Sequence, residues 1–367
     1  MLEKEKLLAA LRLQKTKSVG NILAKKLIVA TGDVTQIFRE KKSSLQKING
    51  IGANALKQLF DKESMELAEK ELGYILQNNI ATSYFLDKDY PKNLSHCIDG
   101  PILFFKEGNI DFNNKRIVSI VGTRNMTSYG RSFCEKLITE LAEYNPIVIS
   151  GFAYGVDICA HNAAIKNQLQ TIAVLGHGFD QIYPKTHKKY MYQVLENGGF
   201  ITEFFHDENP LREHFLKRNR IVAGLSQATI IIESAEKGGS LVTADIANSY
   251  NRDVFAVAGR TTDVYSKGCN HLIKSNQASL LTTADDIARM LNWDLHRTLK
   301  IKQVKLFIEL EEDEQKVVDY LFKSGKQTLD VIALSCVIPV YKLAPMLVQM
   351  ELKGVIKPLP GKMFETV

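Results

Sequence analysis

Three residues that suit a phosphate follow the apolar run at residues 117–121: Gly122, Thr123 and Arg124. Glycine lets a ligand approach the backbone closely, and a threonine hydroxyl can donate a hydrogen bond. Arginine binds a phosphate through two parallel hydrogen bonds. This order of residue types indicates a loop that binds an anion.

Two further stretches, residues 150–157 and 237–243, combine glycines with hydroxyl residues ahead of segments with helical spacing. The free N–H groups and the positive dipole end of a helix attract an anion. Each stretch alone is weak evidence, but several such loops at one edge of a sheet favour a nucleotide or nucleic-acid site. The expected contacts in these stretches are Ser150, Gly151, Gly155, Gly239, Ser240 and Thr243.

Residues 210–220 place an aromatic ring among cations. A base can stack on the ring while the cations hold the backbone of the strand, and such stacking needs an unpaired base. A buried core position for the phenylalanine is the alternative. The candidate contacts are Arg212, Phe215, Lys217, Arg218, Asn219 and Arg220. We expect three of them, Arg212, Phe215 and Lys217, to form one pocket with the arginine of the first loop.

Other chemistries find less support. The sequence has no GxxxxGK[ST] run, which argues against a P-loop ATPase, and no GxGxxG run after the first strand, which argues against a dinucleotide cofactor. Asp157 and His161 stand four residues apart on an expected helix and could share a face as metal ligands or an acid–base pair. Because no third ligand is apparent, we favour structural hydrogen bonds, and we interpret His177 as a turn residue. No metal and no cofactor are expected.

The elements that must position these loops alternate, from residue 80 to about 292, between short β-rich runs and segments of helical length. This alternation predicts a parallel sheet with crossover helices, in which ligands bind beyond the carboxyl ends of the strands. The expected strands are residues 117–121, 147–150, 171–175, 200–203, 228–233 and 253–257.

Residues 1–75 show apolar positions at three- and four-residue spacing with glycine breaks, which predicts a domain of short helices. Residues 48–56 fit a helix-hairpin-helix turn, in which Gly50 and Gly52 would let the backbone approach a DNA phosphate. Residues 18–24 are a weaker second copy. A helical hairpin that only packs on the next domain is an equally supported interpretation.

The C-terminal part is expected to be a linker at residues 293–310 followed by a winged helix at 311–367, because helical runs there precede a small hairpin. Winged helices often bind DNA. Residues 298–367 carry ten Lys against nine acidic residues, however, so a role in protein interaction or dimerisation is as well supported.

Composition and net charge limit the classes of protein to which this chain can belong. The chain has 367 residues, 45% of them hydrophobic and 24% charged, with a net charge of +6, which permits a polyanionic partner without requiring one. Residues 1–30 hold seven Lys or Arg against two Glu. The five cysteines form no CxxC pair, which argues against a disulfide framework or a zinc cluster. The apolar runs are strand-sized and the N-terminus does not fit a secretory signal, so we expect no membrane span and a cytoplasmic location.

Taken together, these motifs resemble the DNA-processing protein A family (DprA, also called Smf), and the resemblance covers about residues 80–290. The segments that carry it are residues 122–124, 129–130, 150–161, 178–184, 218–226, 239–244 and 267–273. The resemblance implies an extended Rossmann fold in a homodimer, with no catalysis. It also implies that single-stranded DNA binds in a basic pocket using Arg124, Arg212 and Phe215, and that the protein helps to load the recombinase RecA in natural transformation. The flanking helical domain, of helix-hairpin-helix or SAM-like type, and the C-terminal winged helix fit the family's layout.

The sequence departs from the family pattern at several positions. Tyr154 stands where the family often has a basic residue, and Leu216 replaces a proline. Residues 258–259 read Ala-Gly rather than Pro-Gly, and residues 276–277 interrupt a Gly-Ala step near the expected dimer surface. The first change alters one expected phosphate contact, and the last alters the expected dimer surface.

Two other functions remain open. Related Rossmann-like enzymes cleave nucleotides at the N-glycosidic bond with a glycine loop followed by glutamates, but here residues 238–243 are followed by Ala244 and Asp245. Acid–base work would have to rest on Asp245 alone. The third possibility is a scaffold that mainly binds protein, and it would show little salt-sensitive affinity for DNA.

Overall fold

The computed structural model describes residues 3–114, 116–293, 310–359 and 363–366, and the chain divides into two compact units near residue 295. Each unit is described by itself. Within the described residues no single helix has the length and apolar composition to cross a membrane. Two short helices of the second unit, Leu329–Cys336 and Val340–Leu352, meet those criteria only together, across a bend of 109°.

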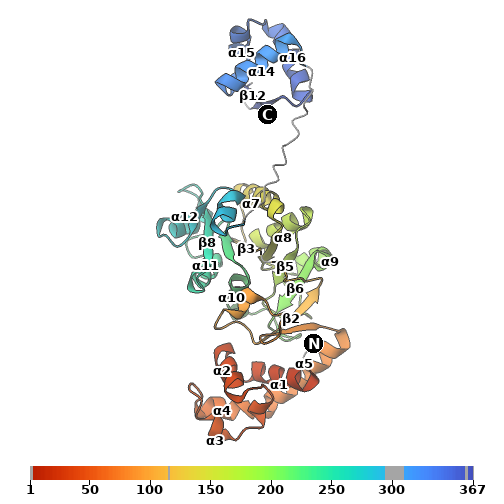
Figure 1. Cartoon of the computed structure of the whole chain (residues 1–367), viewed down its shortest axis with the longest axis vertical. Helices are drawn as coiled ribbons and strands as arrows, with labels where there is room; N and C mark the ends of the chain where they lie inside the picture. The colour runs from red at the N-terminus through yellow and green to blue at the C-terminus, as the bar shows by residue number, and fades with distance from the viewer. Residues whose placement is uncertain (1–2, 115, 294–309, 360–362, 367) are drawn as a thin grey trace. The chain divides into compact units, whose positions relative to one another are not determined.

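The first unit begins with the predicted helical domain. Its helices share one apolar core, in which Leu11, Leu27 and Leu59 are fully buried. The elements are α1 (Lys4–Lys15), α2 (Asn21–Thr31), η1 (Gln36–Phe38), α3 (Lys42–Leu45), α4 (Ala53–Leu59) and α5 (Lys62–Asn78). The core of this domain continues onto β1 (Ala81–Tyr84) and β2 (Leu103–Gly108), so the helices lie against that side of the sheet (Figure 1).

Both predicted hairpin turns lie between helices. Gly20 precedes α2 and Gly52 precedes α4, and neither helix has a side-chain cap at its start. Gly50 adopts φ +99°, a conformation that favours glycine. The side-chain amide of Asn54 donates to the hydroxyl of Ser18 at 3.2 Å, so the two turns are neighbours.

The sheet has nine strands in the described residues, in the order β1-β2-β6-β5-β4-β3-β7-β8-β9. From β6 to β9 all neighbours are parallel, whereas β2 pairs antiparallel with both β1 and β6. The parallel strands are β3 (Ile117–Val121), β4 (Ile147–Ser150), β5 (Thr171–Val174), β6 (Gly198–Thr202), β7 (Ala228–Ile231), β8 (Asp253–Val257) and β9 (Ser279–Leu281).

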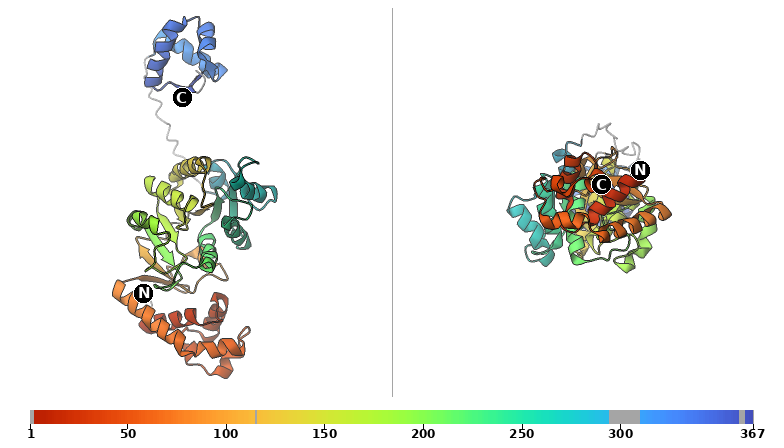
Figure 2. Two further views of the ribbon diagram at one scale, coloured as in Figure 1. Left: turned by 180° about the vertical axis from the view of Figure 1, so that it is seen from behind. Right: turned by 90° about the horizontal axis from the view of Figure 1, so that it is seen from below.

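Helices cover both faces of this sheet (Figure 1, Figure 2). Alternate residues of β3 point to opposite faces, so Val118 and Ile120 pack in one core and Ile117 and Val121 in the other. The first core includes α7 (Ser128–Leu141), α8 (Val156–Lys166) and α13 (Ala284–Met290). The second includes α6 (Lys92–Ser95), α10 (Arg212–Leu225), α11 (Gly239–Ser249) and α12 (Lys267–Lys274). The remaining elements are η2 (Ala142–Tyr144), η3 (Lys185–Tyr190), α9 (Met191–Glu196) and η4 (Val264–Ser266).

All six predicted strands are present, within two residues of their expected ends. The prediction missed β1, β2 and β9, and the sheet is mixed rather than purely parallel. These three strands are short or carry charged and polar residues, and β1 and β9 are edge strands that need no apolar residues on both faces.

Trp293, the first residue of the predicted linker, belongs to the core instead. Its ring is buried against Tyr144, with ring centres 5.9 Å apart, and its indole N–H donates to the side chain of Gln227 at 3.2 Å. Residues 294–309, the rest of the predicted linker except Leu310, lie outside the described residues.

The second unit has the architecture of a winged helix. Three helices, α14 (Glu312–Ser324), α15 (Leu329–Cys336) and α16 (Val340–Leu352), enclose a core of Val317, Leu343 and other apolar residues. A three-stranded sheet in the order β10-β12-β11 completes it, formed by Gln327–Thr328, Met363–Thr366 and Ile356–Leu359 respectively.

Candidate nucleic-acid interface

A cavity of about 410 Å³ lies where the sheet order reverses, outside the carboxyl ends of β3 and β7. We call it the switch-point cavity. Ligands of doubly wound sheets bind at such a point, because the loops after the two central strands diverge there. Ten of the predicted site residues line it: Gly122, Thr123, Arg124, Arg212, Phe215, Arg218, Asn219, Gly239, Ser240 and Thr243.

The loop after β3 is held in place by backbone contacts that require glycine. A Cβ atom at Gly122 would lie 2.5 Å from a methyl carbon of Val156 and 2.9 Å from the carbonyl oxygen of Glu233. The Thr123 amide donates to the same Glu233 carbonyl at 2.8 Å. These contacts fix the direction in which Arg124 leaves the loop.

The loop after β4 packs against the loop after β3. Gly155 has φ +76°, and a Cβ atom there would collide with the carbonyl oxygen of Thr123. The Val156 amide donates to that carbonyl at 3.2 Å. Ser150 is buried and its hydroxyl donates to the Ile120 carbonyl at 2.6 Å. Ser150, Gly151 and Gly155 therefore lie behind the cavity and do not line it, so the structure gives them a supporting position rather than the predicted contact.

Two buried side chains of opposite charge, Arg218 and Asp157, form part of the cavity wall. Arg218 is only 6% exposed, and a Cβ atom at Gly151 would collide with both its guanidinium and the carboxylate of Asp157. Burial raises the pKa of Asp157, although the charge of Arg218 opposes this, and burial lowers the pKa of Arg218. The Nε atom of Arg218 has no hydrogen-bond partner in the described structure. Gly151 has no side chain, and this leaves room for both groups.

Phe215 is half-buried at the cavity, so it is not an interior core residue. The guanidinium carbon of Arg124 lies 5.8 Å from the centre of its ring, and the Tyr183 ring centre lies 5.4 Å away. Gly176 lies beneath the ring, where a Cβ atom would come within 3.0 Å of it. An aromatic ring with one cation beside it and partial exposure is suited to stacking with a base.

The start of α11 supplies backbone donors. Gly238 precedes the helix without a side-chain cap, and a Cβ atom at Gly239 would meet nothing within 4 Å. The Ser240 hydroxyl donates to the Ser234 hydroxyl at 2.8 Å, which anchors the turn. The first N–H groups of the helix therefore border the cavity and have few partners inside the helix. An anion is the ligand they favour.

Two predicted contacts lie elsewhere, which corrects the expected grouping. Lys217 and Arg220 line a second cavity, and Arg220 forms an ion pair with Glu203 and donates to the Asp99 carbonyl at 2.7 Å. The reason is helical geometry. Lys217 is two residues from Phe215 on α10, a rotation of about 200°, so the two side chains point to opposite sides of the helix.

Glu233 was missed by the sequence analysis. It is buried, and its carboxylate accepts hydrogen bonds from the Thr127 amide at 2.9 Å and the Thr127 hydroxyl at 2.5 Å. A Cβ atom at Gly130 would collide with this carboxylate. Glu233 thus fixes the start of α7 and, through its backbone, the first loop. A carboxylate directly after an apolar strand run was the available signal.

Two buried histidines, His161 and His177, make hydrogen bonds within the core. His161 is fully buried, its Nε2 donates to the Gly151 carbonyl at 2.5 Å, and its Nδ1 lies 2.7 Å from the Thr171 hydroxyl. His177 is buried with its Nδ1 2.9 Å from the Gly178 carbonyl oxygen, at the turn where it was expected. Among the described residues no group of three or more His, Cys, Asp or Glu side chains could hold a metal ion.

A doubly wound sheet with glycine loops gathered at its switch point defines a Rossmann-like protein with a site for phosphate-bearing ligands. The model of the DNA recombination-mediator protein A family matches residues 81–292, and that of the DprA winged helix domain matches residues 308–362. The chain belongs to the DNA recombination-mediator protein A family, as the sequence motifs predicted, and the predicted fold class is confirmed with its C-terminal winged helix.

Individual relatives agree. The DNA processing protein DprA of Streptococcus pneumoniae is 40% identical over 202 residues, covering 55% of this chain and 71% of that protein. Protein Smf of Escherichia coli is 34% identical over 283 residues, covering 74% of each. The X-ray structure of the S. pneumoniae protein has a TM-score of 0.68 at 31% identity, covering 80% of this chain and 99% of that one. A structure describing single-stranded DNA binding by DNA processing protein A of Helicobacter pylori has a TM-score of 0.53 at 30% identity, covering 59% and 97%.

Proposed function

We propose that this protein binds single-stranded DNA in the switch-point cavity, protects incoming strands and helps to load the recombinase RecA during natural transformation or homologous recombination. The observation that carries the proposal is the pairing of Arg124 with the half-exposed ring of Phe215 beside the open N-terminus of α11. The H. pylori relative, whose structure describes single-stranded DNA binding, supports the same ligand.

The cavity offers two kinds of contact, one for a phosphate and one for a base. Arg124 and the first amides of α11 favour a phosphate, because both offer N–H donors in a region of positive potential. Phe215 offers a surface on which one base can stack. A base inside a duplex is already stacked on both faces, so this arrangement favours a single strand. Arg212, which is exposed at the same cavity, adds a further cation for the backbone.

Binding without catalysis is part of the proposal. Asp245, the carboxylate that would replace the glutamates of the N-glycosidic enzymes, is exposed and does not line the cavity. Asp157 does line it, but that carboxylate packs beside Arg218 against Gly151. Incubation with common nucleotides is expected to release no free base, and release of base would favour the enzyme instead.

The proposal also includes a homodimer, RecA as the protein partner and a cytoplasmic location. These parts rest on membership of the family and on the resemblance of the motifs. Size-exclusion chromatography with light scattering tests the dimer, and a monomer at micromolar concentration would contradict it. Co-purification with RecA on a single-stranded oligonucleotide tests the partner.

The test of the central proposal compares a labelled single strand with the matching duplex by fluorescence anisotropy at two salt concentrations. We expect tighter binding of the single strand and a marked loss of affinity at the higher salt, because each neutralised phosphate releases counterions. Equal affinity for both forms, or affinity that does not change with salt, would count against it.

A further inference from the structure

Exposed tyrosines lie along the carboxyl edge of the sheet beyond the switch-point cavity. In the order of strands, β4 and β5 follow β3 on the side away from β7. Tyr154 lies in the loop after β4 and Tyr183 in the segment after β5, and their exposed fractions are 45% and 37%. The ring centre of Tyr183 lies 5.4 Å from that of Phe215. The function proposed above gives Tyr154 no role.

Tyr154 stands at the rim of the switch-point cavity. The residue before it, Ala153, lines that cavity. At the residue after it, Gly155, a Cβ atom would lie 2.7 Å from the carbonyl carbon and oxygen of Arg124. The backbone on both sides of Tyr154 therefore borders either the cavity or the loop that carries Arg124. A strand that leaves the cavity on this side passes the tyrosine ring.

The ring of Tyr154 is held in one orientation although it is exposed. Its hydroxyl shares a hydrogen bond of 2.9 Å with the Thr186 hydroxyl, and its ring centre lies 4.9 Å from that of His187, with 76° between the two planes. His187 is buried, and its Nδ1 lies 3.0 Å from the Phe152 carbonyl oxygen. An edge-on contact covers at most one face of a ring, which leaves surface for a base on this exposed side chain. A ring that is already fixed loses little conformational freedom when a base stacks on it.

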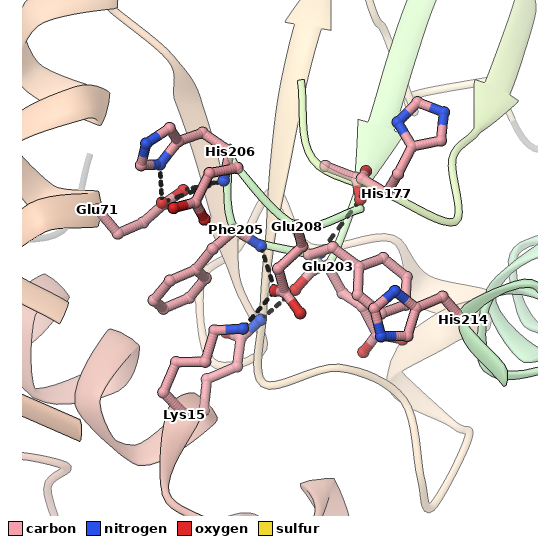
Figure 3. Close-up of polar contacts among 12 residues, drawn as sticks. Lys15, Glu71, His177, Glu203, Phe205, His206, Glu208 and His214 are labelled. Atoms are coloured by element: carbon pink, nitrogen blue, oxygen red, sulfur yellow. Dashed lines mark hydrogen bonds and ion pairs between the residues drawn. The ribbon is translucent and has the colours of Figure 1, made fainter. Parts of the chain in front are cut away.

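The open part of the carboxyl edge ends at β6, because the helical domain covers the segment that follows that strand. There the buried carboxylate of Glu71 accepts a hydrogen bond from the His206 amide at 3.1 Å and pairs with its imidazole, and Lys15 pairs with Glu208 (Figure 3). On this side of the cavity a strand can therefore run over the ends of β4 and β5. Residues 183–192 along that route include three lysines and no acidic residue, a charge that favours a polyanion.

We infer that Tyr154 stacks with a second base of the single strand whose first base lies on Phe215, so that the strand runs from the switch-point cavity across the ends of β4 and β5. This inference rests on the proposed function and adds a second nucleotide position to it. Every base has a π-face, so the position accepts any base and carries no sequence preference.

The direct test uses wild-type protein bound to a strand of about 15 nucleotides, within the range of known single-strand site sizes, that carries 5-iododeoxyuridine throughout. Irradiation joins such a base to an aromatic ring that it stacks on, and mass spectrometry of the peptides identifies the ring. Crosslinks at both Phe215 and Tyr154 are expected. Crosslinks at Phe215 without Tyr154 would overturn the inference and leave the switch-point cavity intact. Crosslinks at neither residue would instead overturn the proposed function.

Affinity for the same strand gives a second readout. Tyr154→Leu lowers it roughly 5- to 100-fold, the equivalent of one lost base stack, and leaves the salt slope unchanged. Tyr154→Phe keeps the ring and therefore the affinity, and an equal loss in both variants would overturn stacking. Tyr192→Leu is the matched control and keeps the affinity. Tyr192 is 69% exposed on α9, but its hydroxyl lies beside the carboxylate of Glu196, which repels a phosphate.

A double variant separates stacking from mere support of the first ring. If each ring holds its own base, the losses of Tyr154→Leu and Phe215→Ala multiply when the two changes are combined. A double variant that binds no more weakly than Phe215→Ala alone would show that Tyr154 only positions Phe215, and it would overturn the second nucleotide position.

Discussion

Arg124 and Phe215 come from different elements, yet their side chains meet at the switch-point cavity, with 5.8 Å between the guanidinium carbon and the ring centre. The first leaves a loop fixed by Glu233, and the second stands on α10 above Gly176. In the proposed function their roles are complementary, since Arg124 binds a phosphate and Phe215 stacks with a base. Each therefore makes a separate prediction.

Replacing Phe215 with alanine should weaken single-strand binding by roughly 1–3 kcal/mol, because the stacking surface for one base is lost. The salt slope should stay the same, since no phosphate contact is removed. Anisotropy titration at several salt concentrations measures both quantities. Phe322→Ala is the control, because Phe322 is 81% exposed and belongs to the second unit. An unchanged affinity in the Phe215 variant would remove this residue from the site.

Replacing Arg124 with alanine should lower the affinity and also flatten the salt slope by about 0.7, since one phosphate contact is lost. Arg131→Ala serves as the matched control, because Arg131 is an exposed arginine of α7 that does not line the cavity. If both arginine variants kept the wild-type slope, Arg124 would not contact the backbone of the strand.

At the scale of elements, the conformations of the loops depend on glycines, which have no side chain to contact a ligand. Sequence patterns predicted which segments are strands and which loops follow them, because apolar β-branched runs bounded by glycine are local signals. They did not predict that Gly151 and Gly155 lie behind the cavity wall. Their positions depend on contacts with Arg218 and Thr123, which belong to other segments of the chain. The sides of α10 could have been read from its periodicity, which separates Phe215 from Lys217.

Gly155→Ala should destabilise the core unit by at least about 1–2 kcal/mol, since the left-handed backbone disfavours a side chain and the new Cβ atom would collide with Thr123. Urea unfolding followed by fluorescence measures this. Trp293 is the single tryptophan and is buried in the core, so its signal reports on that unit. Gly73→Ala in α5, where a Cβ atom meets nothing within 4 Å, should instead be stabilising. A neutral Gly155 variant would contradict the supporting role.

The buried His161 makes the stability of the core depend on pH. Burial lowers its pKa to about 4, and the neighbouring charge of Arg218 acts in the same direction. An unfolded imidazole titrates near pH 6.5, so protonation favours the unfolded chain. The contribution of His161 is complete above about pH 6.5 and is lost as the pH falls towards 4. Between pH 7 and pH 5 it should amount to roughly 2 kcal/mol.

Urea unfolding at both pH values, again followed through Trp293, tests this dependence. His161→Gln should unfold with a smaller change in free energy between the two pH values than the wild type, whatever its absolute stability. Identical pH dependence in both proteins would show that His161 does not titrate in this way.

At the scale of the whole molecule, the sequence predicted the three kinds of domain but not their contacts. The helical domain and the sheet share the core around Phe105, and the hairpin turns border a cavity with α10. No periodicity within one segment specifies which face of another domain it will meet. The edge strand β1, which joins the helical domain to the sheet, was missed because it has few apolar residues, whereas β2 was missed although its first three residues are apolar and buried.

The most direct test of the account is single-strand and duplex binding by the wild type and by the Arg124→Ala, Phe215→Ala double variant, measured by fluorescence anisotropy at two salt concentrations. The account predicts tight, salt-sensitive binding that prefers the single strand in the wild type and is abolished in the double variant. Equal binding of single strands by the two proteins would contradict it, because the switch-point cavity would then not be where the DNA is held.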